Sequence, residues 1–382
     1  MYKILTLNKI SKIGLSVLDT EKYTCADEIA APDAVLVRSA SMHEMKLDEN
    51  TVAVARAGAG VNNIPLADYA DAGVVVFNTP GANANAVKEL VICALLLASR
   101  KVAAAVDWAK GLKGEGENVP KLVEKGKSQF AGPEIMCKTL GVVGMGAIGA
   151  LVADSAAALG MKIIGFDPFL SEAKINEFKA KGYAITANLD DIWTGSDYIT
   201  LHLPLNDGTR GIINAESIEK MKGGVRIVNM ARGELCDSAD LLAALDSGKV
   251  AAYVTDFPNE AQVDHSGVTA IPHLGASTPE SEDNCAVMAA SEVSNYLEKG
   301  IILHSVNYPD LDLPEAFAVR TCFLHDEDEG FAEKAAQAAT AGGAQVENTY
   351  TAAKKGKGYT VIDTDKEFDT SAINAIRVRI LK

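Results

Sequence analysis

The chain contains 382 residues, of which 36 are Lys or Arg and 51 are Asp or Glu, so its formal net charge is −15. Domains usually hold about 100–200 residues, and this length therefore predicts two or three of them. Binding of nucleic acid or of an anionic membrane needs a basic surface, which an acidic chain does not offer. A small anionic ligand is compatible with the net charge, because a few clustered arginines can outweigh it locally.

The cysteine spacing and the apolar segments indicate a cytoplasmic protein. None of the six cysteines belongs to a CxxC pair, so neither a disulfide framework nor a metal site is expected. The most apolar stretch, residues 90–99, is far shorter than the roughly 20 residues that a membrane-spanning helix needs. The N-terminal segment lacks the apolar core of a signal peptide.

Short apolar runs in the first part of the chain predict parallel strands. They are separated by helix-sized gaps and do not alternate with polar residues, as is typical of strands buried on both faces. The runs lie at residues 4–7, 34–37, 52–55 and 74–77. An Ala- and Leu-rich helix is expected over 84–109, followed by a loop or an exposed helix end over 111–132.

A second series of the same kind starts at residue 139. Its expected strands lie at 139–143, 162–166, 198–201, 225–229, 251–255 and 269–271, before a helix at 279–299. A proline-containing linker at 307–315 precedes a unit with the order strand, helix, strand, strand, helix, strand. Its elements are expected at 320–325, 331–341, 345–350, 359–363, a short second helix, and 377–381. We therefore predict an α/β protein with two doubly wound parallel-sheet domains and a small ferredoxin-like α+β domain.

The strongest motif is a glycine turn. Gly144, Gly146 and Gly149 follow an expected strand and open an Ala-rich helix, the arrangement that binds the pyrophosphate of a dinucleotide. Asp167 ends the next strand at close to the usual spacing of about 20 residues, where a carboxylate binds the adenosine ribose. A carboxylate repels a 2′-phosphate, and Pro168 follows where an NADP site usually has Arg. NAD is therefore the expected cofactor.

Three further side chains follow the ends of expected strands in the second series. They are Arg232, Glu260 and His273, and the carboxyl edge of an α/β sheet is where ligands bind. The set suits the oxidation of a 2-hydroxy acid, in which His273 takes the hydroxyl proton, Glu260 orients the imidazole and Arg232 grips the carboxylate. For each residue taken alone, a structural role is equally compatible with the sequence: an ion pair for Arg232, a solvated loop for Glu260 and a helix cap for His273.

These residues resemble a known family. Over about residues 34–306 the chain is similar to the D-isomer-specific 2-hydroxyacid dehydrogenases, and within them most to the branch that oxidises D-3-phosphoglycerate. The matching segments are Val37-Arg38-Ser39 and residues 56–64, 78–81, 144–149, 201–204, 229–233, 257–260 and 272–277. The resemblance implies a catalytic set of Arg232, Glu260 and His273. It also implies a Rossmann-type NAD-binding domain (96–275) inserted into a flavodoxin-like substrate-binding domain (1–95 and 276–306), with an ACT-like domain at 316–382.

The resemblance also implies the binding residues. Those expected to bind NAD are Gly144, Gly146, Ala147, Ile148, Gly149, Asp167, His202, Pro204, Met230, Ala231, Asp256, Gly275 and Ala276. Those expected to bind the substrate are Arg38, Ser39, Arg56, Gly58 and Asn78. Thr255 and Asp256 stand where the family has Asp-Val, so the nicotinamide-side aspartate is either shifted to Asp256 or replaced by Thr255.

Arg38 and Arg56 bear on the choice of substrate. Both follow expected strands, and a substrate with a carboxylate and a phosphate needs cations at each end, so we expect these two arginines to bind the phosphate. For either one alone, a surface ion pair is the alternative. The expected reaction is oxidation of D-3-phosphoglycerate to 3-phosphohydroxypyruvate, the first step of serine biosynthesis. The alternatives are glyoxylate or hydroxypyruvate reduction, which needs no such pair, and the role of an NAD-sensing corepressor. The family implies a homodimer or a homotetramer.

The C-terminal segment resembles the ACT domains that bind serine in some family members. Those domains carry an Asn and a Pro in the turn after their first strand. Here that turn runs from His325 to Gly330 with acidic residues in their place, which argues against feedback by serine and leaves a role in assembly as an alternative.

Overall fold

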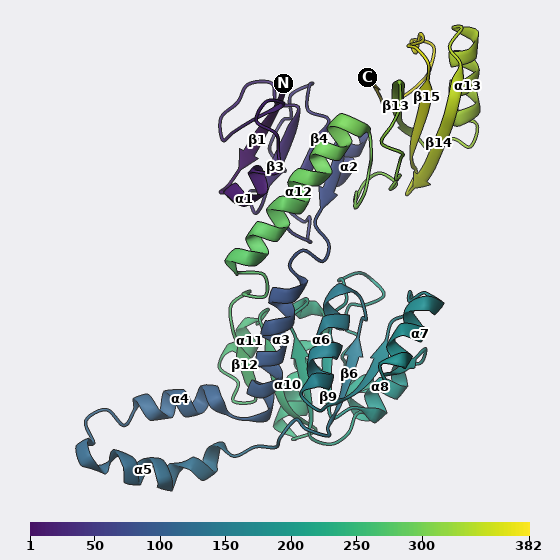
Figure 1. The fold of residues 1–382 in the computed structure, drawn as a ribbon. Coiled ribbons are helices and arrows are strands. Elements are labelled where there is room, and N and C mark those ends of the chain that lie inside the picture. The colour runs from purple at the N-terminus through teal and green to yellow at the C-terminus, as the bar shows by residue number, and fades with distance from the viewer. The chain divides into compact units, whose positions relative to one another are not determined.

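The structure is a computed structural model that describes all 382 residues, and the chain divides into two compact units. Unit 1 comprises Met1–Asn83 and Thr278–Lys382, and unit 2 comprises Ala84–Ser277. Figure 1 shows each unit with its own sheets and helices. None of the helices is long and apolar enough to span a lipid bilayer.

Unit 1 contains a five-stranded parallel sheet with the order β2-β1-β3-β4-β5. Its strands are β1 (Tyr2–Leu7), β2 (Tyr23–Ala26), β3 (Ala34–Val37), β4 (Ala53–Arg56) and β5 (Val75–Asn78). This is the flavodoxin-like order of a doubly wound fold, as the sequence predicted. The sequence missed β2, because this edge strand is only partly buried and has no continuous apolar run.

Three helices pack in the N-terminal part of unit 1: α1 (Lys12–Leu15), α2 (Leu66–Asp71) and α12 (Pro279–Lys299). The bounds predicted for α12 are confirmed, since Thr278 caps its start and Gly300 ends it in the left-handed conformation, with φ 71°. Small residues on α12 allow α1 to approach closely. A Cβ added to Gly14 would lie 2.3 Å from the Cβ of Ala286, so this contact requires glycine.

Unit 2 contains a seven-stranded parallel sheet with the order β12-β11-β10-β9-β6-β7-β8. Its strands are β6 (Thr139–Val143), β7 (Lys162–Phe166), β8 (Ala184–Thr186), β9 (Tyr198–Leu201), β10 (Val225–Asn229), β11 (Val250–Thr255) and β12 (Val268–Ala270). The six strands β8-β7-β6-β9-β10-β11 follow the Rossmann order 3-2-1-4-5-6, which confirms the predicted fold class. Only the short edge strand β8 was not predicted from the sequence.

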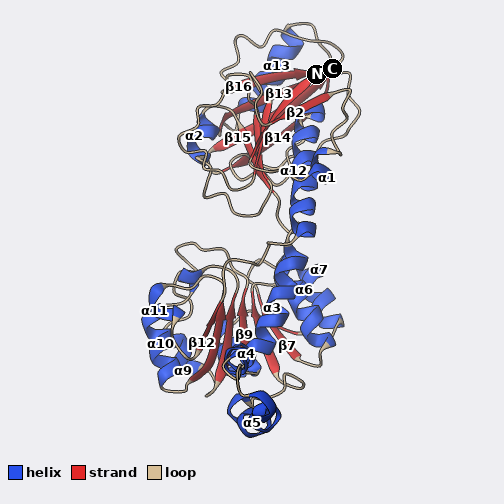
Figure 2. Cartoon of the chain, turned by 90° about the vertical axis from the view of Figure 1, so that its left-hand side faces the viewer, coloured by secondary structure: helices blue, strands red, loops and turns tan.

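Helices cover both faces of this sheet, as Figure 2 shows. They are α3 (Ala84–Ser99), α6 (Ala147–Ala158), α7 (Glu172–Ala180), α8 (Leu189–Gly195), α9 (Ala215–Lys220), α10 (Ser238–Asp246) and the short α11 (Glu260–Val263). Apolar residues of α3 and α6 form one core layer, and those of α8, α9 and α10 form the other. The domain boundary expected at residue 95 lies inside α3, which clusters with unit 2.

The single helix predicted over 84–109 is wrong, because α3 ends at Ser99 and α4 (Val102–Lys110) starts anew. The Ser99 hydroxyl donates to the carbonyl of Leu95 and lies 2.8 Å from the hydroxyl of Tyr198, which holds this end of α3 against the sheet. A Cβ on Gly132 would lie 2.0 Å from the Ser99 carbonyl oxygen, so the returning chain packs directly on the break.

Residues 101–132 form an arm that extends from the rest of unit 2 (Figures 1 and 2). It contains α4, α5 (Val119–Gly126) and two 3-10 turns, and no residue of either helix is buried. The rings of Trp108 and Phe130 lie 5.5 Å apart, and Trp108 also packs on Gly126. The arm is thus held together by one aromatic contact and leaves its apolar side chains exposed.

The C-terminal part of unit 1 is an antiparallel sheet with the order β14-β15-β13-β16. It comprises β13 (Val319–Asp326), α13 (Phe331–Ala341), β14 (Val346–Lys354), β15 (Lys357–Thr364) and β16 (Arg377–Leu381). The ferredoxin-like strand order agrees with the prediction, but the second helix does not form. Instead, the Asp369 carboxylate accepts from the backbone N–H of Ser371, and such local side-chain bonds compete with helix formation.

The other face of this sheet packs on the end of α12. Arg320 is fully buried, forms a bidentate pair with Asp363 at 2.7 and 2.8 Å, and donates to the Lys299 carbonyl. Arg379 donates to the carbonyls of Tyr296 and Leu297. The last carbonyls of a helix have no partners within it, so these two arginines cap α12 and attach the C-terminal sheet to it.

We expect Arg320→Met to destabilise the protein by about 3–5 kcal/mol, because it leaves the Asp363 carboxylate buried without its counter-ion. Urea unfolding at neutral pH measures the effect, and the double change Arg320→Met with Asp363→Leu should recover most of the loss. The control is Lys334→Met, which breaks the exposed pair with Asp328 and should cost less than about 1 kcal/mol. Equal losses for both single variants would contradict the assignment.

Candidate active site

The glycine turn after β6 is shaped by two close contacts and one open position. Gly144 has φ 94°, and a Cβ there would lie 2.5 Å from the His202 carbonyl oxygen. A Cβ on Gly149 would lie 1.9 Å from the carbonyl oxygen of Gly144, so α6 packs against the turn without a side chain between them. At Gly146 a Cβ would meet nothing within 4 Å, which leaves the backbone open to a ligand.

The start of α6 fits a bound pyrophosphate. Gly146 is the N-cap residue and has no side chain to satisfy the N–H groups of the first turn, which Ala147 and Ile148 begin. Asp167, at the end of β7, accepts from the backbone N–H of Met145 at 3.0 Å and thereby holds the turn. Carboxylate oxygens accept more than one hydrogen bond each, so Asp167 can also accept from ribose hydroxyls.

The segment after β9 contributes an uncharged imidazole. The Nε2 of His202 lies 3.0 Å from the Thr200 hydroxyl oxygen, and burial lowers the pKa of His202 to about 3. His202 is therefore neutral at physiological pH. Pro204 follows in a turn that its carbonyl closes by accepting from the Thr209 hydroxyl at 2.6 Å.

Asn229 shapes the loop that presents Arg232. It is fully buried at the end of β10; its Oδ1 accepts from the backbone N–H groups of Ala231 and Arg232, and its Nδ2 donates to the Arg232 carbonyl at 2.8 Å. Sequence analysis gave this residue no role of its own. A polar side chain that ends an otherwise apolar strand was the available signal. The neighbouring Met230 is buried below the loop.

Phe257 brings Arg232 and His273 to the same place. The Arg232 guanidinium carbon lies 5.4 Å from the centre of the Phe257 ring, and the His273 ring centre lies 4.3 Å from it. A cation above an aromatic face is stabilised by about 0.5–1 kcal/mol at an exposed site. The structure thus places two of the three expected catalytic residues on one aromatic side chain, which the sequence analysis had not assigned.

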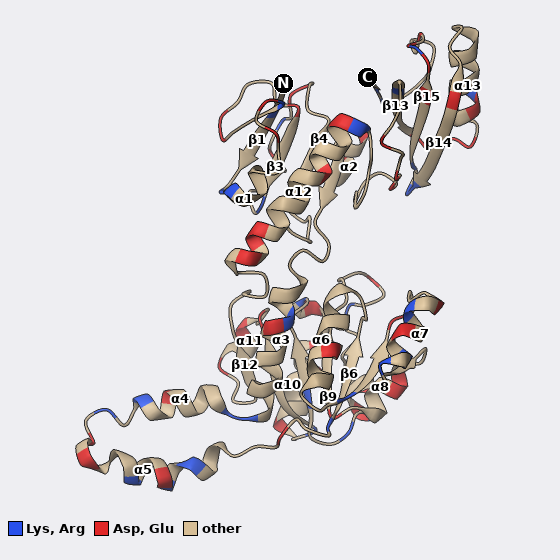
Figure 3. Cartoon of the chain, viewed as in Figure 1, with Lys and Arg blue, Asp and Glu red and all other residues tan.

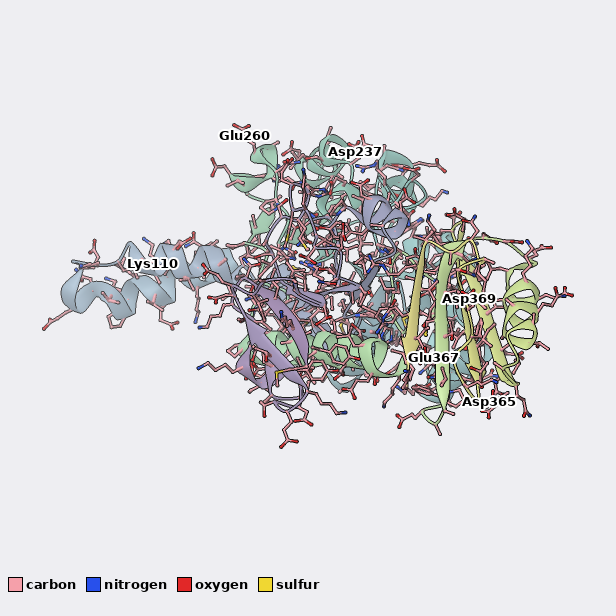
Figure 4. The ribbon with its side chains drawn as sticks, turned by 90° about the horizontal axis from the view of Figure 1, so that it is seen from above. Lys110, Asp237, Glu260, Asp365, Glu367 and Asp369 are labelled. Atoms are coloured by element: carbon pink, nitrogen blue, oxygen red, sulfur yellow. The ribbon has the colours of Figure 1, made fainter.

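Glu260 is not part of this contact. It is the first residue of α11, behind a capping box in which Asn259 and Gln262 exchange hydrogen bonds. Its side chain is exposed and points outward in Figure 4, and no hydrogen bond or ion pair joins it to His273. The structure therefore does not bring Glu260 to the imidazole that the sequence expects it to orient.

Asp256 is the acid that lies near Arg232 and His273. It is 2% exposed, and no side chain donates a hydrogen bond to its carboxylate oxygens. Burial raises the pKa of Asp256, while the His273 side chain, the backbone N–H of Gly275 and the Arg232 side chain act in the opposite direction. A Cβ on Gly275 would lie 3.5 Å from its Oδ2. An unsatisfied buried acceptor costs about 1–3 kcal/mol, so this carboxylate suits a ligand that brings a donor.

The expected substrate residues of unit 1 lie at the carboxyl ends of their strands. Arg38 directly follows β3, and the Nε of Arg56, the last residue of β4, donates to the Arg38 carbonyl at 3.1 Å. Gly58 has φ 153°, and a Cβ there would lie 2.6 Å from the Arg56 Nη1, so glycine leaves room for the guanidinium. The Arg38 guanidinium forms an ion pair with Glu282 at 2.7 Å.

Ser39 follows Arg38 in the chain, and Asn78 lies opposite Arg56 on the neighbouring strand β5. The backbone N–H of Ser39 donates to the Asn8 side chain at 3.0 Å. The Asn78 side chain donates to the Ala59 carbonyl at 2.6 Å and so ties β5 to the loop that contains Gly58. Both residues thus fix the loops that carry the arginines.

In the turn that resembles an effector site, the His325 side chain contacts residues of the same domain. His325 is buried and stacks on Phe331, with ring centres 3.6 Å apart. Its Nε2 lies 2.9 Å from the Thr360 hydroxyl and its Nδ1 lies 2.7 Å from the Asp326 carbonyl oxygen. Both ring nitrogens therefore have protein partners, and burial lowers the pKa of this imidazole.

The strand order of unit 2, the open glycine turn before α6 and the acid that follows β7 define a dinucleotide-binding α/β fold. A family model described as "D-isomer specific 2-hydroxyacid dehydrogenase, NAD binding domain" matches residues 92–275. Residues 92–275 therefore belong to the D-isomer-specific 2-hydroxyacid dehydrogenase family as its NAD-binding domain, and they lie in unit 2.

Relatives and solved structures agree with this assignment. The chain is 33% identical over 333 residues to the D-3-phosphoglycerate dehydrogenase of Bacillus subtilis, a match that covers 82% of this chain and 61% of that protein. It resembles the NAD⁺-bound 3-phosphoglycerate dehydrogenase structure from Entamoeba histolytica, with 26% identity, a TM-score of 0.63 and coverage of 81% and 99%. A glyoxylate reductase structure from Paecilomyes thermophila matches with 27% identity, a TM-score of 0.65 and coverage of 80% and 98%. The chain spans 50–61% of the length of the curated relatives it matches.

The glycine turn allows a test of cofactor binding that is separate from folding. We expect Gly146→Ala to leave the melting temperature unchanged, because the added methyl meets no protein atom, and to weaken NAD binding by about tenfold, because it occupies the approach to the backbone. Calorimetric titration with NAD measures the affinity. Gly149→Ala is the matched control and should lower the melting temperature instead. Unchanged NAD affinity in Gly146→Ala would contradict the site.

Proposed function

We propose that the chain is a cytoplasmic, NAD-dependent D-2-hydroxyacid dehydrogenase that oxidises D-3-phosphoglycerate to 3-phosphohydroxypyruvate, the first step of serine biosynthesis. The observation that carries the choice of substrate is the juxtaposition of Arg38 and Arg56 at the strand ends of unit 1. Two guanidinium groups at one place suit a phosphate dianion. The names of the curated relatives support the same substrate.

We infer that NAD is held by the residues of unit 2 that the family resemblance implies. The pyrophosphate binds at Gly144, Gly146 and the first turn of α6, and Asp167 accepts from the adenosine ribose. The nicotinamide side is held by His202, Pro204, Met230, Ala231, Asp256, Gly275 and Ala276. The buried Asp256 carboxylate, to which no side chain donates, supports its role as acceptor for the carboxamide N–H groups. When bound, NAD supplies the acceptor for the hydride that leaves C2 of the substrate.

The reacting groups of the chain are Arg232 and His273. Arg232 binds the substrate carboxylate with its planar fork of donors, and its loop is preorganised by Asn229. His273 accepts the hydroxyl proton as the hydride leaves, and returns a proton in the reverse reaction. Glu260 stabilises the resulting imidazolium, which requires α11 to move its exposed carboxylate to the ring.

We expect Arg56→Ala to raise the KM for D-3-phosphoglycerate by about 10- to 100-fold, because a charged hydrogen-bonding partner contributes roughly 1.5–3 kcal/mol. The KM for an unphosphorylated 2-hydroxy acid such as D-glycerate should change by less than about threefold. Steady-state kinetics with NAD measure both. Equal effects on the two substrates would remove the phosphate role of Arg56 and favour a glyoxylate or hydroxypyruvate reductase, the activity named for the fungal structural neighbour.

We also propose a homodimer or homotetramer assembled through the arm. Helices α4 and α5 have nine and eight residues, and none of these is buried. Isolated helices shorter than about 12–15 residues have marginal stability in water, so contact with another protein surface would stabilise the arm. A second copy of the chain supplies this surface, and the exposed Val106 and Val123 side chains form the apolar contacts with it.

Replacing both Val106 and Val123 by Asp should dissociate the assembly, because two charges would be buried in the contact. Light scattering after gel filtration measures the mass, and the expected result is a species of half the original mass or less. Asp107→Asn, on the same helix, is the control and should leave the mass unchanged. An unchanged mass for the double variant would place the interface elsewhere.

A further inference from the structure

The Glu282 carboxylate forms an ion pair with the Arg38 guanidinium. Arg38 follows β3, and Glu282 lies in the first turn of α12, where Figure 3 shows a concentration of acidic residues. The Nη2 of Arg38 and the Oε1 of Glu282 are 2.7 Å apart, with 37% and 42% of the two side chains exposed. One of the two arginines assigned to the substrate phosphate is therefore already paired with a carboxylate of the same unit.

The neighbouring acid shows that this pair is not needed to hold α12 in place. Asp283 accepts a hydrogen bond from the Ser11 hydroxyl and so connects α12 to the start of α1. The close contact between Gly14 and Ala286 fixes the same two helices. Glu282 contributes to neither contact, and Arg38 is its ion-pair partner.

An ion pair with this exposure is weak and easily exchanged. A phosphate offers Arg38 a bidentate, doubly charged partner and displaces the carboxylate from the guanidinium. The displaced Glu282 still lies close to the anion. Two like unit charges about 4 Å apart in water-like surroundings weaken binding by about fivefold.

We propose that Glu282 is a specificity-determining residue, whose carboxylate occupies Arg38 in the absence of substrate and weakens the binding of a phosphate dianion there. This inference rests on the proposed function only in assigning Arg38 to the phosphate. Glu282 sets the affinity for phosphorylated substrates below what the two arginines alone would give. Substrates without a phosphate do not compete with it.

The test is Glu282→Gln, which keeps a hydrogen-bond acceptor for Arg38 and removes the charge. The KM for D-3-phosphoglycerate should fall by about fivefold with kcat unchanged, and the KM for D-glycerate should stay the same. Asp283→Asn removes the same charge one residue later and should change neither KM. A KM for D-3-phosphoglycerate that stays constant or rises in Glu282→Gln would overturn the proposal, as would an equal fall in Asp283→Asn.

A binding measurement separates this inference from the reaction itself. Inorganic phosphate is titrated calorimetrically into the full-length protein without NAD, and its Kd should fall by about fivefold in Glu282→Gln and in Glu282→Ala. In an Arg38→Ala background, the additional Glu282→Gln change should have no effect. An effect that persists without Arg38 would overturn the proposal. If the chain fails to oxidise D-3-phosphoglycerate, the proposed function fails, and the phosphate titration still decides the role of Glu282.

Discussion

In both units a parallel sheet brings the carboxyl ends of its strands to one edge, and the residues of the candidate site depend on this constraint. In unit 2 the loops after β10 and β11 meet because their strands are hydrogen-bonded neighbours, which puts Arg232 beside Phe257. In unit 1 the neighbouring strands β3 and β4 do the same for Arg38 and Arg56. The pairing and register of the strands thus determine which side chains lie next to each other at the edge of the sheet.

Backbone groups and aromatic rings hold the important cations in this acidic chain. Arg56 is anchored on the carbonyl of Arg38, and Arg232 lies over Phe257 with its loop held by Asn229. Arg38 forms an ion pair with the Glu282 carboxylate. The strength of an anion site on this protein therefore depends on what anchors each arginine as much as on how many there are.

Helix α12 connects the N-terminal and the C-terminal parts of unit 1. Its first turn carries the acid that faces Arg38, and its last carbonyls are capped by Arg320 and Arg379 from the C-terminal sheet. The C-terminal sheet also shares its core with α12, through residues such as Tyr359. The C-terminal sheet is therefore packed as part of unit 1. Its buried, doubly bonded His325 supports a structural role for the turn that resembles an effector site.

The sequence by itself determined the features that depend on local chemistry. Continuous apolar runs located β9 and β10, and glycines located the turn before α6. The NAD-binding family followed from these motifs in their order. Tertiary structure decided the features that depend on residues far apart in the chain. Ser99 ends α3 because of Tyr198 and Gly132, Glu260 stays away from His273, and Glu282 reaches Arg38 across more than 200 residues of sequence. Local propensity does not encode such contacts, since they exist only once the sheets have brought distant segments together.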